Sequence, residues 1–157
     1  MRNMRLLPLI LGIFLNSGLG FCQNGLPPFS ISISTVKATV PVGTGVWLNV
    51  QMTNTSDHPV DCSSVYVGGT DRRFQYDVRD ESGASMKKPN MHPERASGSI
   101  QMCTLKPGET VSHETLVSWL HDFSRPGRYS IQLMRGATDD ENDGVVKSNT
   151  ITITVIR

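Results

Sequence analysis

Residues 127–134, Gly-Arg-Tyr-Ser-Ile-Gln-Leu-Met, and residues 149–155, Asn-Thr-Ile-Thr-Ile-Thr-Val, decide the fold class of this chain. Apolar and polar side chains alternate in both runs, and a period of two places every second side chain on one face of a β-strand. Such a strand can bury one face while the other meets water. The two runs therefore predict half-buried strands, and not helices, at the C-terminal end.

Six further stretches carry strand-type patterns, and turn-forming residues separate them. Their ranges are 29–34, 46–54, 60–67, 74–79, 99–105 and 111–117. Strands of this length joined by short turns are typical of an antiparallel sandwich. Residues 23–157 show no internal linker or repeat, so we expect a single domain. The prediction is an all-β, immunoglobulin-like antiparallel β-sandwich of about seven to eight strands.

Residues 1–22 predict a secretory signal peptide. Two arginines precede an apolar stretch from Leu6 to Leu15, and small and polar residues follow it. A membrane-spanning helix would need about 20 apolar residues, so this stretch favours removal over anchoring. We expect an exported protein, periplasmic or extracellular, with no stable membrane insertion once the signal is removed.

The cleavage point has two alternatives. Small residues one and three positions before the cut allow cleavage after Gly20 or after Cys22, and we favour the second. Lipid attachment to Cys22 is a further alternative, but Phe21 precedes it where lipoprotein signals normally have a small residue.

The charge balance gives no sign of a nucleic-acid partner. The chain has 15 basic and 14 acidic residues, and removal of Arg2 and Arg5 with the signal leaves 13 against 14, a formal charge of −1. Proteins that bind nucleic acids usually carry a strongly basic face. We therefore predict no nucleic-acid binding.

Cys62 and Cys103 are the cysteines that remain after the predicted cleavage. An exported chain meets oxidising conditions, so one disulfide between them is the simplest interpretation. The alternative is a pair of buried or reactive thiols, because a sequence cannot show that two Cα atoms approach each other.

No group of residues indicates a particular catalytic or cofactor chemistry. His113, His121 and Asp122 could supply a base and its orienting carboxylate, but the chain lacks a Gly-x-Ser-x-Gly nucleophile motif. The acidic run 139–143 does not match a calcium-binding loop. Soft copper ligands occur without paired spacing, at Met86, Met91, His92, Met102 and Cys103. We therefore predict no enzymatic activity, no cofactor and no metal site.

Five landmarks follow one another in a familiar order. They are Asn-Thr-Ser-Asp-His-Pro-Val at 54–60, Tyr-Asp-Val-Arg-Asp-Glu-Ser-Gly at 76–83, Leu-Lys-Pro-Gly-Glu at 105–109, Trp119, and Pro-Gly-Arg-Tyr at 126–129. Together they resemble BsuPI-like domains, immunoglobulin-like sandwiches named for an intracellular proteinase inhibitor of bacilli. The resemblance implies that the loop Ala84–Gly98 could enter a protease cleft. The export signal and the two cysteines depart from the namesake.

Tyr129 follows a Pro-Gly pair at the start of a late strand. This placement looks like the tyrosine corner of immunoglobulin-like sandwiches, in which the hydroxyl bonds to main chain a few residues upstream. We expect Tyr129 to have a structural role.

Trp47, Met91 and His92 are the candidate interface residues. Trp47 falls on the polar face of its strand, and an exposed tryptophan often contributes strongly to an interface. Burial of Trp47 beneath the loop 84–98 is the alternative. The predicted function is a secreted or periplasmic, non-enzymatic module that binds an unknown protein partner. The alternative function is a proteinase inhibitor that acts through an exposed loop.

Overall fold

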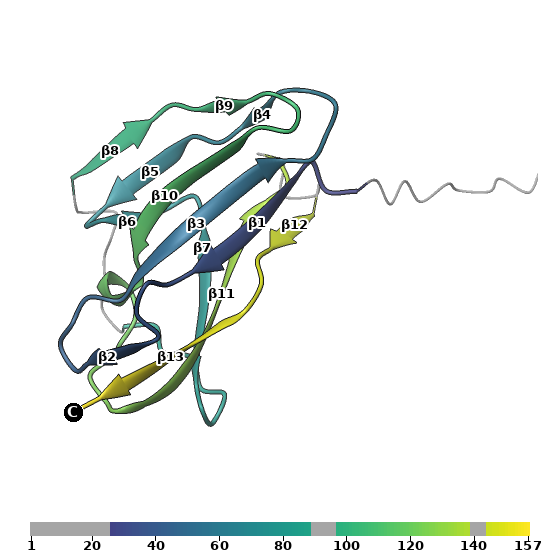
Figure 1. The fold of residues 1–157 in the computed structure, drawn as a ribbon. Coiled ribbons are helices and arrows are strands. Elements are labelled where there is room, and N and C mark those ends of the chain that lie inside the picture. The colour runs from purple at the N-terminus through teal and green to yellow at the C-terminus, as the bar shows by residue number, and fades with distance from the viewer. Residues whose placement is uncertain (1–25, 89–96, 139–143) are drawn as a thin grey trace, which may run out of the picture.

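The computed structural model describes residues 26–88, 97–138 and 144–157, which form two packed β-layers and a smaller β-arm (Figure 1). The predicted signal peptide, Met91, His92 and the acidic run 139–143 lie outside the described residues. The predicted all-β, immunoglobulin-like sandwich is confirmed. The elements are β1 (Phe29–Ser34), β2 (Thr39–Pro41), β3 (Trp47–Asn54), β4 (Val60–Asp61), β5 (Ser64–Val67), β6 (Thr70–Asp71), β7 (Gln75–Asp80), β8 (Gly98–Gln101), β9 (Thr104–Leu105), β10 (Thr110–Leu116), the 3₁₀-helix η2 (Val117–Trp119), β11 (Gly127–Gly136), β12 (Val145–Lys147) and β13 (Ile151–Ile156).

The first layer consists of β1, β3 and β10, which pair antiparallel in the order β1-β3-β10. Leu48, Val50 and Met52 of β3 are buried. Trp47 and Gln51, which alternate with them, are exposed. Because successive side chains of a strand point to opposite faces, this layer has one apolar and one polar face.

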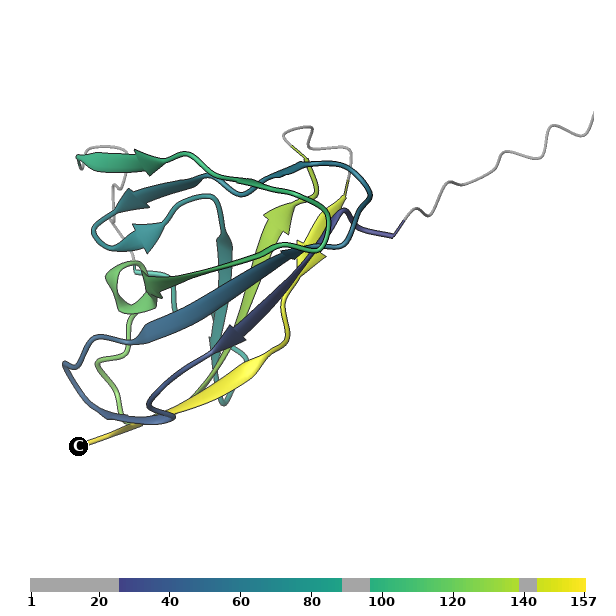
Figure 2. The ribbon, with the colours of Figure 1, turned by 45° about the horizontal axis from the view of Figure 1, so that its top comes forward.

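The second layer has β11 beside β7, β12 and β13, and β2 lies on the outer side of β13. Tyr129, Ile131 and Leu133 of β11 are buried together with the apolar face of the first layer. Figures 1 and 2 show the two layers face to face. Removing these apolar faces from water is the main stabilising contribution to such a fold.

The strand β2 departs from the antiparallel prediction, because it pairs parallel to β13. The chain leaves the first layer after β1, and the amide of Thr154 donates to the carbonyl of Ala38 over 2.7 Å. Val40 is buried in the core at this point. A strand of three residues is too short to show a period of two, so the sequence pattern missed it, as it missed β6 and β12.

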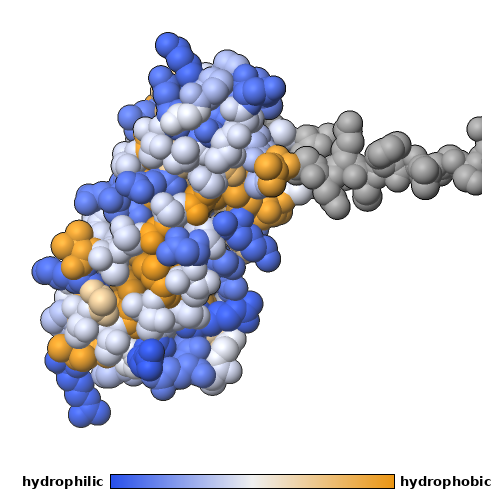
Figure 3. Space-filling view, turned by 45° about the vertical axis from the view of Figure 1, so that its right-hand side comes forward, coloured by the Kyte–Doolittle hydropathy of each residue, from blue (hydrophilic) through white to orange (hydrophobic). Residues whose placement is uncertain are grey.

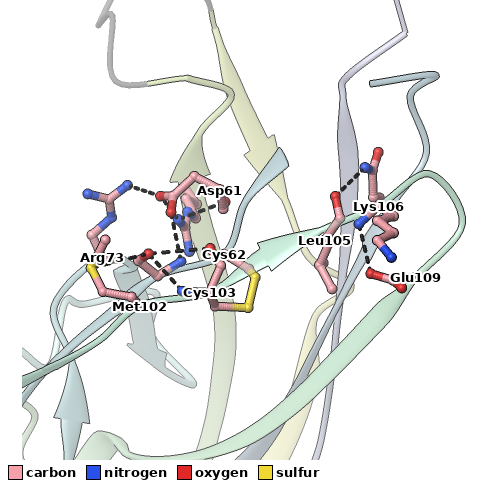
Figure 4. The surroundings of a disulfide bond; sticks show 11 residues. Asp61, Cys62, Arg73, Met102, Cys103, Leu105, Lys106 and Glu109 are labelled. Carbon is pink, nitrogen blue, oxygen red and sulfur yellow. Dashed lines mark hydrogen bonds and ion pairs between the residues drawn. A yellow bond between two sulfur atoms is a disulfide. The ribbon is translucent and has the colours of Figure 1, made fainter. Parts of the chain in front are cut away.

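The remaining strands, β4, β5, β6, β8 and β9, form the arm. The predicted strands 60–67 and 99–105 do pair with each other, but each is interrupted, at Cys62-Ser63 and at Met102-Cys103. The hydroxyl of Ser63 accepts a hydrogen bond from the amide of Cys103 over 3.1 Å, in place of a regular ladder bond. Cys62 and Cys103 form the predicted disulfide here, with their Cα atoms 4.8 Å apart (Figure 4).

The predicted loop Ala84–Gly98 begins and ends in hydrogen-bonded structure. The amide of Met86 donates to the carbonyl of Val78 over 2.9 Å, and the amide of Asp122 donates to the carbonyl of Met86 over 2.8 Å. Gly98 is the first residue of β8. Residues 84–88 of this loop therefore pair through their main chain in isolated bridges, which their irregular sequence pattern did not indicate.

On the face shown in Figure 3, apolar residues form a broken band between polar ones. Within the three described ranges we find no helix with the length and hydropathy that a bilayer crossing requires.

Candidate binding surface at Trp47

Trp47 begins β3 and lies on the polar, outward face of the first layer. Trp47 is 46% exposed. This agrees with the predicted exposed position and not with burial beneath the loop 84–98. Large aromatic side chains are usually buried. The exposure of Trp47 is therefore a feature of this surface that the fold alone does not require.

The indole ring of Trp47 lies close to two glycines. A Cβ atom at Gly45 would lie 3.1 Å from the indole Nε1, and a Cβ atom at Gly69 would lie 3.3 Å from Cη2 at the other end of the ring. The indole thus occupies space that side chains at these positions would need. The ring therefore packs close to glycine main chain at both ends.

Gly69 belongs to the two-residue turn between β5 and β6. Gly68 and Gly69 both have positive φ angles, 59° and 80°, and Val67 pairs with Thr70 across the turn. Two-residue hairpin turns of type I′ require positive φ at both central residues, which explains the Gly-Gly pair. A Cβ at Gly68 would overlap the indole ring of Trp119, so Trp119 packs directly onto this turn. We call Trp47, Trp119 and the Gly68-Gly69 turn the tryptophan–glycine platform.

Glu114 supplies a negative charge beside the platform. In the β3–β10 register Leu116 lies opposite Trp47 and Glu114 lies opposite Asn49, so Glu114 is the diagonal neighbour of Trp47 on the outward face. Glu114 is exposed. Within the part of the chain that the structure describes, it forms no ion pair.

Two hollows flank the indole of Trp47, and Glu114 lines both. One hollow of about 500 Å³ is lined by Trp47, Glu114, Tyr66, the Gly68-Gly69 turn and the start of β8. The other, of about 360 Å³, lies toward β2 and includes Lys37. Trp47 and Glu114 are the described residues that the two hollows share.

The strand β8 ends the first hollow and is also an edge of the arm. Among the described strands it pairs with β5 alone, and all four of its residues are exposed. Ile100 is 70% exposed, and Met102 just after the strand is 80% exposed. An edge strand with apolar side chains can pair with a strand from another chain.

A separate group of polar residues lies inside the fold, at the junction of the arm and β10. The Nε2 atom of His113 lies 3.3 Å from Oδ2 of Asp71, which is completely buried. The other carboxylate oxygen of Asp71 accepts hydrogen bonds from the amides of Val65 (3.1 Å) and Arg73 (3.0 Å). Burial acts to raise the pKa of Asp71, but the neighbouring His113 and the hydrogen bonds from the amides of Arg73 and Val65 offset it and leave the pKa lowered.

Two hydroxyl groups complete this buried cluster. The hydroxyl of Tyr76 donates to the carbonyl of Asp71 over 2.8 Å and lies 2.7 Å from the hydroxyl of Thr115. The Thr115 oxygen also accepts from the amide of Asp71 over 3.0 Å. Since Tyr76 donates its proton to the carbonyl, Thr115 is the donor between the two hydroxyls. Burial raises the pKa of Tyr76, so its proton stays in place.

The candidate bases His113 and His121 and the carboxylate of Asp122 do not form a catalytic group in the structure. His113 faces Asp71, which the sequence did not single out, and not Asp122. His121 is buried beside the ring of Tyr76, and burial lowers the pKa of its imidazole. The described residues contain no cluster of three or more His, Cys, Asp or Glu side chains that could hold a metal ion. Cys103 is in the disulfide, so it offers no thiolate.

Tyr129 lies in the second layer, away from the platform. Its hydroxyl donates a hydrogen bond of 2.6 Å to the carbonyl of Arg125, four residues upstream, and its ring packs edge-on against Phe123. This is the geometry of a tyrosine corner.

Three residues that surround Trp47 were not found from the sequence: Gly45, Gly69 and Glu114. The Gly-Gly pair was visible as the end of a strand, but its contact with Trp47 depends on strands far apart in the chain. Alternation along 110–116 places Glu114 on an outward face, yet only the register with β3 brings it beside Trp47.

No protein-family model matches the chain, and no curated protein sequence matches it. Among solved structures it is similar to a CARDB domain from Pyrococcus furiosus, at 16% identity over 82% of this chain and 93% of that one, with a TM-score of 0.44. It is also similar to a β-glucosidase from Listeria innocua (14% identity, 81% of this chain, TM-score 0.42) and a DNA-bound alkylpurine DNA glycosylase from Pseudomonas fluorescens (12%, 83%, 0.45). The chain spans 16% and 31% of the length of those two enzymes. Likenesses at these TM-scores carry no argument about function, and the BsuPI-like resemblance stays a prediction.

Proposed function

We propose that this protein is an exported, non-enzymatic β-sandwich module that binds another protein through the tryptophan–glycine platform. The observation that carries the proposal is the indole of Trp47, which is 46% exposed and lies close to Gly45 and Gly69. Tryptophans offer a large contact area and are among the residues on which protein interfaces depend most.

The surroundings of Trp47 support a protein as the partner. The hollow beside it leads to β8, where main chain and the side chain of Ile100 are both exposed. A partner could therefore fill the hollow with one side chain and pair an extended segment with β8. The resemblance to BsuPI-like domains supports a binding role as well.

Two further observations support the remaining parts of the proposal. The disulfide between Cys62 and Cys103 fits an oxidising compartment, as export would provide. The His113–Asp71 pair has a completely buried carboxylate, so it suits stabilisation of the arm better than contact with a substrate.

The test is affinity capture with residues 23–157 carrying an N-terminal tag, from the exported fraction of the native host. The matched control for Trp47→Ala is Ile156→Ala, because Ile156 is 45% exposed and lies in the second layer, at the end of β13. We expect a protein that the wild type and Ile156→Ala retain and Trp47→Ala loses. Titration of that purified protein should then show at least about tenfold weaker binding for Trp47→Ala.

Equal capture and equal affinity for all three forms would contradict the proposal. The inhibitor alternative rests on the loop Ala84–Gly98, whose residues 89–96 lie outside the described residues. Assays against serine, cysteine and metalloproteases would detect it as inhibition that survives Trp47→Ala.

A further inference from the structure

We propose that the hollow between Trp47 and the start of β8 receives a basic side chain, Lys or Arg, from the protein partner. This inference rests on the proposed function and adds the chemistry of the partner residue. It follows from the charge, the aromatic surface and the shape of this one hollow.

Charge is the first reason. Glu114 is the one charged side chain among the described residues that line the hollow. It is exposed and has no ion-pair partner in the described parts of the chain. The neighbouring hollow differs, because Lys37 lines it together with Glu114. In the hollow beside β8, a cation can bind the carboxylate of Glu114. In the hollow toward β2, the ammonium group of Lys37 competes with it.

The aromatic surface is the second reason. A guanidinium or ammonium group over an indole is attracted by the electrons of the ring, and tryptophan is the strongest of the aromatic residues in this respect. Trp47 presents its ring beside Glu114 on the same face of the layer. One cation can therefore contact the indole and the carboxylate together.

The shape of the hollow is the third reason. The turn and the start of β8 contribute Gly68, Gly69 and Gly98, which have no side chains to fill the space. A Cβ at Gly98 would lie 2.6 Å from the carbonyl oxygen of Tyr66, so main chain approaches closely here. A long, slender side chain such as Lys or Arg suits an open hollow whose lining combines glycine main chain with Trp47 and Tyr66.

Other occupants fit less well. An acidic side chain would be repelled by Glu114, and an apolar one would remove water from the carboxylate without replacing its hydrogen bonds. The charge of Glu114 therefore favours a basic side chain over the other kinds.

The direct probe is N-acetyl-arginine amide, compared with N-acetyl-citrulline amide, which has a similar shape and no charge. The readout is the NMR signal of the Trp47 indole Nε1–H in the full mature chain, assigned with Trp47→Phe. We expect a saturable shift with the arginine amide and at least about tenfold weaker binding of the citrulline amide.

The matched variants are Glu114→Gln and Glu81→Gln. Both replace an exposed glutamate, but Glu81 accepts a hydrogen bond from the amide of Arg128 and lies outside the hollow. We expect Glu114→Gln to weaken arginine amide binding about three- to fivefold and Glu81→Gln to change it less than about 1.5-fold. Equal shifts with the charged and neutral amides, no saturable shift, or equal binding by both variants would overturn the inference.

The outcome for the proposed function is separate. A captured partner that depends on Trp47 but binds Glu114→Gln with wild-type affinity leaves the proposed function standing and overturns the basic side chain. Selective arginine amide binding without any Trp47-dependent partner supports the charge preference of the hollow and overturns the proposed function.

Discussion

The two faces of β10 carry polar residues in opposite surroundings, one set buried and the other exposed to solvent. On the inward face, Thr115 and His113 lie among buried partners, and Thr115 forms hydrogen bonds to both Asp71 and Tyr76. On the outward face, Glu114 is exposed and has no ion pair within the described ranges. Residues next to each other in sequence therefore face a buried polar cluster on one side and solvent on the other.

The difference separates stability from recognition. A buried polar group that loses its partner destabilises the fold, because its desolvation is no longer offset. An exposed carboxylate next to an exposed indole contributes little to stability but can bind a partner. Substitutions on the inward face should therefore change the free energy of unfolding, and those on the outward face should change binding.

The largest effect is expected for Asp71→Ala. This variant removes the acceptor of the Val65 and Arg73 amides and leaves His113 without its carboxylate. We expect a loss of about 3–5 kcal/mol in the free energy of unfolding, the range for breaking a buried pair from one side. Urea denaturation at pH 7 measures it. A loss below about 1 kcal/mol would show that the buried cluster does not hold the arm to β10.

A smaller loss is expected for Thr115→Val, which keeps the side-chain shape and removes the hydroxyl. The amide of Asp71 would lose its acceptor, and the hydroxyl of Tyr76 would lose one of its two partners. We expect about 2–3 kcal/mol of destabilisation by the same denaturation measurement. Wild-type stability of this variant would mean that water replaces the hydroxyl and the network is not closed.

Tyr129→Phe tests whether the same rule holds in the second layer. The variant removes the hydrogen bond to the carbonyl of Arg125 and keeps the ring against Phe123. We expect a loss of about 1–3 kcal/mol from the unsatisfied carbonyl, measured as a shift in thermal midpoint and in urea midpoint. An unchanged midpoint would remove the tyrosine corner from the stabilising contacts.

The contrast between Tyr129 and Asp71 shows what the sequence can predict. Tyr129 and its acceptor lie within one turn, and the Pro-Gly pair marks that turn, so local sequence was sufficient. Asp71 and His113 come from the arm and from β10, and no local pattern links them. The long strands were predictable because alternation over several residues reports which face is buried. Contacts of Trp47 with Gly45 and Gly69 depend on register and turn geometry, which a single sequence leaves open.

Lowering the pH should destabilise the inward face less than Asp71→Ala does, because protonated Asp71 remains in place and still accepts hydrogen bonds. The pKa of Asp71 is lowered from its ordinary value of 3.8, so its charge stabilises the fold fully above pH 3.8. That contribution is lost as the pH falls through the lowered pKa. We expect Asp71→Asn to be less stable than the wild type at pH 7 and the gap to narrow below pH 3.8. A constant gap in urea midpoints across this range would contradict the shift.

The smallest effect on stability is expected for Glu114→Gln, the outward neighbour of Thr115. Glu114 has no ion pair in the described structure, and its side chain is exposed, so the change should stay within about 0.5 kcal/mol. Thr115→Val and Glu114→Gln together form the sharpest comparison, since they differ by one position and by the face of the strand. If Glu114→Gln destabilised the fold as much as Thr115→Val, the carboxylate would have a structural role in the free protein. The division between an inward network for stability and an outward surface for recognition would then fail at β10.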